Sequence, residues 1–326
     1  MELSGKRFLV IGGAGFIGSH IVDQLTQTDA REIIVYDNFC RGARSNLAEA
    51  LKDPRVSVFD IGGDVLQTDI LSRAMEGIDG VFHLAALWLL QCYDYPRAAF
   101  DVNIRGTFNV AEAAIAAGVK RVVYSSSASV YGNALEIPMT ENHVYNNETF
   151  YGATKICGEH IFKSLGCRYG LNWVGLRYMN VYGSRQDYKG TYTAVIHKVL
   201  DRIEAGQPPL VYGDGSQQYD FIDVRDTARA NLLAMQADVN GECYNVGRGI
   251  GTTIKELAEL ILQLTDCHQK IQYEPAGRTF VTNRIGCPKK ADRDLGFRWQ
   301  IELEDGLRDL IDWRQQDRVR TTAAEH

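Results

Sequence analysis

Tyr151 and Lys155 are four residues apart, shortly after a run of three serines at 125–127. Positions i and i+4 of a helix lie on one face about one turn apart, so both side chains could contact one ligand. A phenol titrates near ~10, and a nearby fixed cation lowers its pKa by favouring the phenolate. Tyr151 could therefore accept a proton from a hydroxyl whose carbon gives up hydride. Taken alone, the pair also fits a solvated helix face.

Gly12, Gly15 and Gly18 occupy the turn between an expected strand and an expected helix. The apolar run 7–11 is typical of a buried strand, and 16–25 has the pattern of a helix. Glycines here permit a tight turn and close approach of the backbone, so that a pyrophosphate can bind at the helix N-terminus. The sequence therefore predicts a dinucleotide-binding loop.

A second apolar strand, 32–36, ends at Asp37, roughly 20 residues beyond the glycines. A carboxylate there accepts hydrogen bonds from the adenosine ribose and repels a 2′-phosphate, which predicts NAD rather than NADP. Arg41 and Arg44 lie nearby and weaken that preference. Strand, glycine turn, helix, strand and acid in this order predict a bound NAD cofactor.

Composition is consistent with a cytoplasmic enzyme that acts on small molecules. The chain has 326 residues and a net charge of −6 without a long basic stretch, so nucleic acid is not an expected partner. Its seven scattered cysteines lack metal-type spacing, which predicts reduced thiols and no metal site. We expect no signal peptide and no membrane span, because no apolar run approaches the ~18 residues that a span needs.

The first half alternates strand and helix patterns, which predicts an α/β fold with a doubly wound parallel sheet of Rossmann type. Such sheets bind ligands at the carboxyl ends of their strands. Further strands are expected at 56–59, 80–84, 121–124 and 173–177, and further helices at 69–75, 97–117 and 151–169.

The pattern changes after Gly183, where turn-forming Gly and Pro residues separate shorter elements. We expect residues 1–183 to form the NAD-binding domain and 184–314 a smaller mixed α/β lobe that mainly binds substrate. Residues 315–326 are expected to be a polar, frayed tail. Helices in this half are expected at 193–204, 225–235, 253–264 and 303–313.

Taken together, these motifs resemble the extended short-chain dehydrogenase/reductases of the nucleotide-sugar epimerase and dehydratase family, such as UDP-glucose 4-epimerase. The resemblance covers nearly the whole chain. The segments that carry it are GGAGFIG at 12–18, HLAA at 83–86, SSSASVYG at 125–132, YGATK at 151–155 and LRYMNVYG at 176–183.

The resemblance implies roles for individual residues. Ser127 would hold a sugar oxygen, Tyr151 would exchange its proton, and Lys155 would bind the nicotinamide ribose and tune Tyr151. Asn180 would bind the substrate diphosphate. The implied cofactor-binding positions, including the glycines and Asp37, are Gly12, Gly15, Phe16, Ile17, Gly18, Asp37, Asn38, Asp64, Val65, Leu84, Ala85, Ala86, Asn103, Tyr151, Lys155 and Tyr178.

Asn103 and His83 also fit a purely structural role. Asn103 could instead only fix a helix to the sheet, and His83 is expected to be a packing or hydrogen-bonding residue at a strand end. A serine cluster alone usually forms an ordinary turn, so the role of Ser127 depends on the other motifs.

Family members share oxidation at sugar C4 and then diverge. A 4,6-dehydratase needs an acid and a base where this chain has Ala128 and Ser129, and decarboxylases of the group usually have a glutamate at the position of Ser129. Neither residue can exchange protons at C5 or C6, so dehydration and decarboxylation are disfavoured. C4 epimerisation of a UDP-sugar through a transient 4-keto sugar is the expected reaction.

The chain departs from the family pattern at two places. The bulky run 87–92 could line the sugar site or pack in the core. Tyr219 stands where relatives usually have an arginine for the diphosphate, so Arg185 or Arg278 is expected to supply that cation. Arg278 could equally be a surface residue.

Two rival functions remain at this point. A non-catalytic dinucleotide sensor could discard Ser127, Tyr151 and Lys155, which this chain retains. A simple NAD-linked dehydrogenase would release NADH, whereas an epimerase keeps its cofactor. The resemblance also implies a homodimer, formed through the helices near 97–117 and 148–169.

Overall fold

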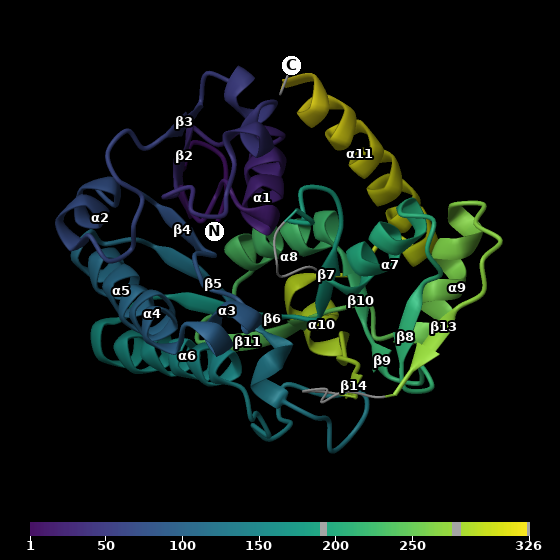
Figure 1. The fold of residues 1–326 in the computed structure, drawn as a ribbon. Coiled ribbons are helices and arrows are strands. Elements are labelled where there is room, and N and C mark those ends of the chain that lie inside the picture. The colour runs from purple at the N-terminus through teal and green to yellow at the C-terminus, as the bar shows by residue number, and fades with distance from the viewer. Residues whose placement is uncertain (190–193, 276–281, 325–326) are drawn as a thin grey trace.

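The structure is a computed structural model that describes residues 1–189, 194–275 and 282–324. Its centre is a seven-stranded sheet in which every neighbouring pair is parallel (Figure 1). The order reverses between β1 and β4, and that switch point opens a crevice at the carboxyl ends of the strands. In spatial order the strands are β11 (Glu242–Val246), β6 (Trp173–Tyr178), β5 (Arg121–Ser127), β4 (Gly80–His83), β1 (Arg7–Ile11), β2 (Glu32–Tyr36) and β3 (Val56–Val58).

Helices cover both faces of this sheet, as the predicted Rossmann fold requires. Successive strand residues point to opposite faces, so Val10 packs in one core cluster and its neighbours Leu9 and Ile11 in another. On the first face lie α1 (Phe16–Thr26) and α8 (Val224–Gln236); on the second lie α2 (Thr68–Ala74), α5 (Gly106–Ala116) and α6 (Phe150–Tyr169). The fold class is confirmed.

The helix predicted over 97–117 is interrupted. It begins after α3 (Leu89–Asp94) as α4 (Pro96–Ala99), with proline at the first position, where its missing N–H costs nothing. A π-helical segment, Phe100–Arg105, then leads into α5. Such segments often occur at functional sites.

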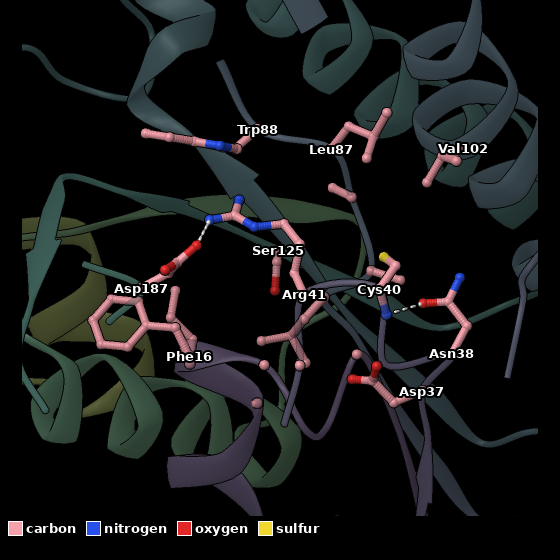
Figure 2. A pocket seen from close by; sticks show the side chains of 18 of the residues that line it. Phe16, Asp37, Asn38, Cys40, Arg41, Leu87, Trp88, Val102, Ser125 and Asp187 are labelled. Atoms are coloured by element: carbon pink, nitrogen blue, oxygen red, sulfur yellow. Dashed lines mark hydrogen bonds and ion pairs between the residues drawn. The ribbon is translucent and has the colours of Figure 1, made fainter. Parts of the chain in front are cut away.

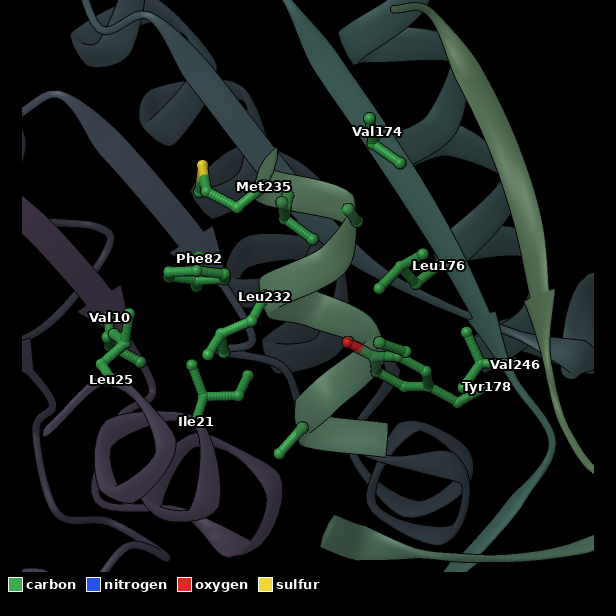
Figure 3. Close-up of a cluster of buried hydrophobic side chains, with 14 of the residues drawn as sticks. Val10, Ile21, Leu25, Phe82, Val174, Leu176, Tyr178, Leu232, Met235 and Val246 are labelled. Atoms are coloured by element: carbon green, nitrogen blue, oxygen red, sulfur yellow. The ribbon is translucent and has the colours of Figure 1, made fainter. Parts of the chain in front are cut away.

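Two elements from the second half of the chain complete the NAD-binding half. β11 pairs with β6 as the edge strand of the sheet, and α8 packs against α1 and the sheet, as Leu232 and Met235 show in Figure 3. Arg121 in β5 donates to the carbonyl oxygens of Ala234 and Met235 (3.0 and 3.1 Å) at the end of α8, and the N-terminal ammonium of Met1 also donates to Met235 O, at 2.9 Å. A single boundary at residue 183 therefore does not separate the sheet from the lobe.

The remaining elements form a mixed α/β lobe, as predicted, with several short sheets instead of one. Its own core includes Val199, Phe221, Leu257 and Leu307. The elements are β7 (Asn180–Tyr182), α7 (Val195–Glu204), β8 (Leu210–Tyr212), β9 (Gln218–Tyr219), β10 (Phe221–Asp223), β12 (Thr252–Thr253), α9 (Ile254–Leu264), β13 (Gln272–Glu274), β14 (Asn283–Arg284) and α11 (Leu303–Ala324). The short helix α10 (Lys289–Leu295) packs instead against β11 and α8.

The last helix corrects the expectation of a frayed tail after Arg314. α11 continues to Ala324, and Arg314 is buried against α7, with its Nη2 atom 3.0 Å from Glu204 Oε2. Arg318, one turn further on, pairs with the same carboxylate at 2.5 Å. These ion pairs hold the polar turns of α11 on the lobe, which apolar periodicity does not reveal.

All seven cysteines are free thiols. Within the described ranges, none of the helices has both the length and the apolar character that a membrane crossing demands.

Candidate functional site

A pocket of about 330 Å³ lies at the carboxyl ends of the sheet strands, next to the N-terminus of α1. Figure 2 shows Asp37 and Asn38 on one side of it and Trp88 and Asp187 on the other, with the Arg41 side chain between them. Fifteen of the sixteen predicted cofactor positions line this pocket: Gly12, Gly15, Phe16, Ile17, Gly18, Asp37, Asn38, Asp64, Val65, Leu84, Ala85, Ala86, Tyr151, Lys155 and Tyr178.

The glycine loop approaches its neighbours too closely for any side chain. Gly12 has a φ of +80°, and a Cβ on it would lie 2.8 Å from the backbone nitrogen of Ala85. A Cβ on Gly18 would lie 2.2 Å from the Gly12 carbonyl oxygen. The α1 N-terminus follows directly and has no side-chain cap, so its free N–H groups face the pocket. This arrangement fits a pyrophosphate.

Asp37 lies at the end of β2 with both carboxylate oxygens held by the backbone. Oδ2 accepts from Ala14 N at 2.9 Å and Oδ1 from Phe39 N at 2.8 Å. Burial raises the pKa of this carboxyl, and these hydrogen bonds oppose the rise. Because each carboxylate oxygen can accept more than one hydrogen bond, Asp37 can also accept from ribose hydroxyls.

Arg41, which weakened the preference for NAD, is engaged within the protein. Its guanidinium lies 5.2 Å from the centre of the Trp88 ring, and its Nη2 atom is 3.3 Å from Asp187 Oδ2. Arg44 lies over the Phe39 ring instead. With the Arg41 charge balanced by Asp187, the arrangement fits NAD better than a cofactor carrying a 2′-phosphate.

Tyr151 and Lys155 meet at the inner end of the pocket, one turn apart on α6. Lys155 Nζ donates to the Ser125 carbonyl oxygen at 2.7 Å and lies 5.7 Å from the centre of the Tyr151 ring. Burial lowers the pKa of the Lys155 ammonium to about 8. The helix N-terminus that presents Tyr151 is capped by Thr149, whose hydroxyl accepts from Gly152 N at 3.1 Å.

The acidity of Tyr151 differs from the expectation. In the protein chain itself burial raises the pKa of its phenol to about 12, and this rise is opposed by Ser127 and Arg284, not by Lys155. Lys155 directs its ammonium at the Ser125 carbonyl oxygen of β5. Tuning of Tyr151 by Lys155 in the NAD-bound enzyme stays a prediction.

Ser127 lies at the end of β5, within hydrogen-bonding reach of Tyr151. Its hydroxyl accepts from Ser129 N and donates to Ser129 Oγ, both at 3.1 Å. A second, smaller cavity of about 50 Å³ adjoins this turn. Its lining residues are Ser129, Gly132, Asn133, Asn146, Asn147, Glu148, Thr149 and Arg284.

Asn103 does not line the pocket. Its side chain is buried in the π-helical segment, where Oδ1 accepts from Leu87 N at 2.7 Å and Nδ2 donates to Leu87 O at 2.9 Å and to Thr154 Oγ1 at 3.1 Å. Asn103 therefore fixes the segment that contains Leu87 to α6. This is the structural role that the sequence left open as an alternative to cofactor binding. His83 is also buried, hydrogen-bonded to Thr107 at 3.0 Å, and burial lowers its pKa to about 3.

The predicted substrate residues come from several elements. Arg185 lines the cofactor pocket, where its Nη1 pairs with Asp23 of α1 at 2.7 Å. Asn180 begins β7, and its backbone N donates to Asp220 O at 2.9 Å. Tyr219 is half-buried in β9 and packs on Phe221. Arg278 lies outside the described residues.

The structure adds residues that the sequence did not assign. The bulky run 87–92 is divided: Leu87 and Trp88 line the pocket, and Cys92 is buried behind them. Asp187 and Gln186 reach the pocket from the segment after β7. Asp187 contacts Arg41 although more than 140 positions separate the two residues in the sequence, so no local pattern could reveal this contact.

Comparisons with known proteins agree with this geometry. The model of the NAD dependent epimerase/dehydratase family matches residues 8–247. A putative UDP-glucose 4-epimerase of Methanocaldococcus jannaschii is 33% identical over 312 residues, which cover 95% of this chain and 98% of that protein.

Solved structures give the same result. UDP-glucose 4-epimerase of Thermotoga maritima with UDP-glucose has a TM-score of 0.88 at 31% identity, covering 95% of this chain and 99% of that one. UDP-glucuronic acid 4-epimerase of Bacillus cereus, in complex with UDP-glucuronic acid and NAD, has a TM-score of 0.87 at 26% identity with the same coverage.

Other relatives are a decarboxylase and a 4,6-dehydratase of nucleotide sugars, so the family covers several reactions. The match over most of the chain, the Rossmann-type sheet and the pocket at its switch point lead to one assignment. The chain belongs to the NAD-dependent epimerase/dehydratase family and is an NAD-dependent enzyme.

Proposed function

We propose that the protein interconverts the C4 epimers of a UDP-sugar through a transient 4-keto sugar. The observation that carries this proposal is that Tyr151 and Lys155 line the pocket with Ser127 within hydrogen-bonding reach of Tyr151, and that Ala128 and Ser129 follow Ser127. That arrangement supplies one proton-exchanging group at C4 and none for C5 or C6. The dehydratase and decarboxylase reactions need further acid–base groups.

Each of the three residues has a distinct task. The positive charges of Lys155 and of bound NAD would favour the Tyr151 phenolate, which takes the proton from the C4 hydroxyl and returns it. The Ser127 hydroxyl, within hydrogen-bonding reach of Tyr151, holds the same sugar oxygen. Lys155 stays oriented by its bond to the Ser125 carbonyl and binds the nicotinamide ribose. NAD, when bound, accepts the hydride from C4 and gives it back to the other face of the keto sugar.

The pocket supports NAD as the cofactor that stays bound. Gly12, Gly15 and Gly18 would hold its pyrophosphate, and Asp37 its adenosine ribose. Arg41, Trp88 and Asp187 lie together across this pocket, which favours retention of the cofactor through turnover. A dehydrogenase that releases its keto product would instead have to exchange NADH at every turnover.

The test is an NMR assay of the enzyme with NAD and a panel of UDP-, GDP-, CDP- and dTDP-sugars. We expect conversion of a UDP-sugar to its C4 epimer without net NADH. Tyr151→Phe should lower that rate about 10²- to 10⁴-fold with NAD still bound. A 4-keto-6-deoxy product, a pentose or accumulating NADH would reject the epimerase in favour of a dehydratase, a decarboxylase or a dehydrogenase, respectively.

We also propose that the protein is a cytoplasmic homodimer. Phe100, Phe108 and Phe150 are exposed along the predicted contact helices, which supports an apolar interface there. Seven free thiols fit a reducing compartment. Light scattering of the purified protein gives the oligomeric state, and a monomer would reject the dimer.

A further inference from the structure

Arg284 lies beside the catalytic residues, although it comes from a distant part of the chain. β14 pairs with β9 in parallel, with Arg284 opposite Tyr219, and the Arg284 carbonyl accepts from Asp220 N at 2.9 Å. Residues opposite each other in neighbouring strands point to the same face of the sheet. Arg284 therefore extends from the same face as Tyr219, the position where related enzymes were expected to have a phosphate-binding arginine.

The side chain of Arg284 is half-buried, and its Nε atom is buried with no hydrogen-bond partner. Among the residues that the structure describes, no carboxylate forms an ion pair with it. Burial lowers the pKa of Arg284, as expected for a cation removed from water. A desolvated charge without a counter-charge is costly to the fold, and a bound anion would offset that cost.

The position of this cation is at the reacting end of the site. Arg284 is one of the two groups that oppose the raised pKa of Tyr151, which places its charge close to the phenol. It also lines the small cavity together with Ser129, whose hydroxyl accepts from Ser127. The cavity is next to the catalytic turn and not next to the glycine loop.

The other cavity-lining groups are suited to a polar sugar but not to a charged one. Ser129, Asn147 and Thr149 are neutral, and Glu148, which also lines the cavity, is an exposed residue. An arginine binds a carboxylate through two parallel hydrogen bonds, which gives both strength and geometric selection. Arg284 is the cation of this cavity that could select for such a group.

We propose that Arg284 binds a carboxylate carried by the hexose, so that the preferred substrate is a UDP-sugar with an anionic sugar ring. This inference rests on the proposed nucleotide-sugar function and extends it to the class of sugar. Arg284 contacts the substituent while Tyr151 exchanges the C4 proton. In this arrangement other residues bind the diphosphate, although Arg284 shares a face with Tyr219.

The test measures binding, so it does not depend on turnover. UDP-glucuronate, UDP-glucose and UDP are titrated by calorimetry into the NAD-loaded Tyr151→Phe protein, alone and with Arg284→Gln or Arg284→Lys. Arg293→Gln is the matched control, because it removes one exposed cation of α10 that pairs only with its neighbour Asp294. NAD affinity and melting temperature report whether each variant is folded.

We expect Arg284→Gln to weaken UDP-glucuronate binding about 10- to 100-fold and to change UDP-glucose and UDP less than about threefold. Arg284→Lys should retain part of the selectivity, because lysine keeps the positive charge but lacks the paired N–H donors of the guanidinium. This variant also serves as the test if Arg284→Gln does not fold. The control should match the parent.

Two results would overturn the proposal. Equal losses for all three ligands would place Arg284 at the diphosphate, and unchanged affinities would remove it from the ligand site. Failure of the proposed function has a different signature. In that case the NMR assay gives no C4 epimer from any sugar, while the selective loss of UDP-glucuronate binding still stands.

Discussion

Arg177 of β6 and Glu159 of α6 form a buried ion pair behind the catalytic residues, with Nη2 and Oε2 2.8 Å apart and both side chains about 5% exposed or less. The same carboxylate accepts from Ser126 Oγ at 2.6 Å and from Tyr145 Oη at 2.9 Å. The pair therefore ties the helix that carries Tyr151 and Lys155 to two central strands. Its satisfied hydrogen bonds are what make a buried charge tolerable.

Replacing Glu159 by Gln should lower the free energy of unfolding by about 3–5 kcal/mol, because Arg177 would stay buried without its counter-charge. Chemical denaturation at neutral pH measures this. Glu304→Gln is the control: that carboxylate is exposed and pairs with Arg308 at i+4, so its loss should cost no more than about 0.5 kcal/mol. Similar losses in both variants would contradict the assigned importance of the buried pair.

The stability that Glu159 contributes should also depend on pH. Burial by itself would raise the pKa of Glu159, but the charge and hydrogen bonds of Arg177, together with the hydrogen bonds from Ser126 and Tyr145, outweigh burial and hold the pKa below its ordinary value. A carboxyl with a depressed folded pKa stabilises the fold above its unfolded pKa, near ~4.3. That contribution is lost as the pH falls through the folded value. The difference between the wild type and Glu159→Gln should therefore shrink on acidification.

Gly12→Ala should prevent NAD binding and destabilise the protein more than Gly118→Ala does. Both glycines have positive φ, +80° and +68°, so both variants carry a backbone penalty of about 1–2 kcal/mol. Only at Gly12 would the new Cβ also meet backbone, at 2.8 Å from Ala85 N, whereas nothing lies within 4 Å at Gly118. Fluorescence titration with NAD and thermal melts compare the two. Equal effects would show that close approach is unimportant.

Lys155→Met should abolish activity and yet stabilise the fold at pH 7 by about 1–3 kcal/mol. Burial lowers the pKa of Lys155 to about 8. Below that pH the folded protein contains a desolvated ammonium, which lowers its stability. The unfolded chain binds the proton more tightly between about pH 8 and ~10.4, so wild-type stability should rise over this window. Denaturation curves across pH test this, and a less stable Lys155→Met at pH 7 would contradict it.

Asp37→Ala should weaken NAD binding about 10-fold or more and reduce the discrimination against NADP. The carboxylate is the group expected to accept from the ribose hydroxyls, and its charge would repel a 2′-phosphate. Affinities for both dinucleotides are measured by calorimetry. Because Asp37 also accepts from Ala14 N, Asp37→Asn serves as the control that keeps an acceptor for the loop. If Asp37→Ala kept full selectivity for NAD, another residue would have to set it.

Local patterns predicted the sheet and the cofactor pocket well. The strand at 7–11, the helix from 16 and the strand at 32–36 lie where apolar periodicity placed them, and the glycines and Asp37 meet at their ends. These features depend on neighbours close in sequence. The pairing of β11 with β6 joins residues about 70 positions apart, and no local pattern indicates it.

The sugar end of the site depends on long-range contacts that no spacing encodes. Arg284 reaches Tyr151 from a two-residue strand, and Arg185, expected at the substrate, pairs with Asp23 of α1. Likewise, Glu204 holds the polar end of α11 through an ion pair across the lobe, and the sequence of α11 does not reveal this contact. A residue's partner, not its type, determines its role in each case.

The late position of β11 in the chain affects how the protein is made. Six strands of the main sheet are complete once residue 178 has been synthesised, but the edge of β6 stays unpaired until residues 242–246 emerge from the ribosome. An open hydrophobic strand edge is a template for wrong pairing between chains. A fragment ending at residue 183 should therefore aggregate, and nascent chains should need most of the lobe before the nucleotide half can close.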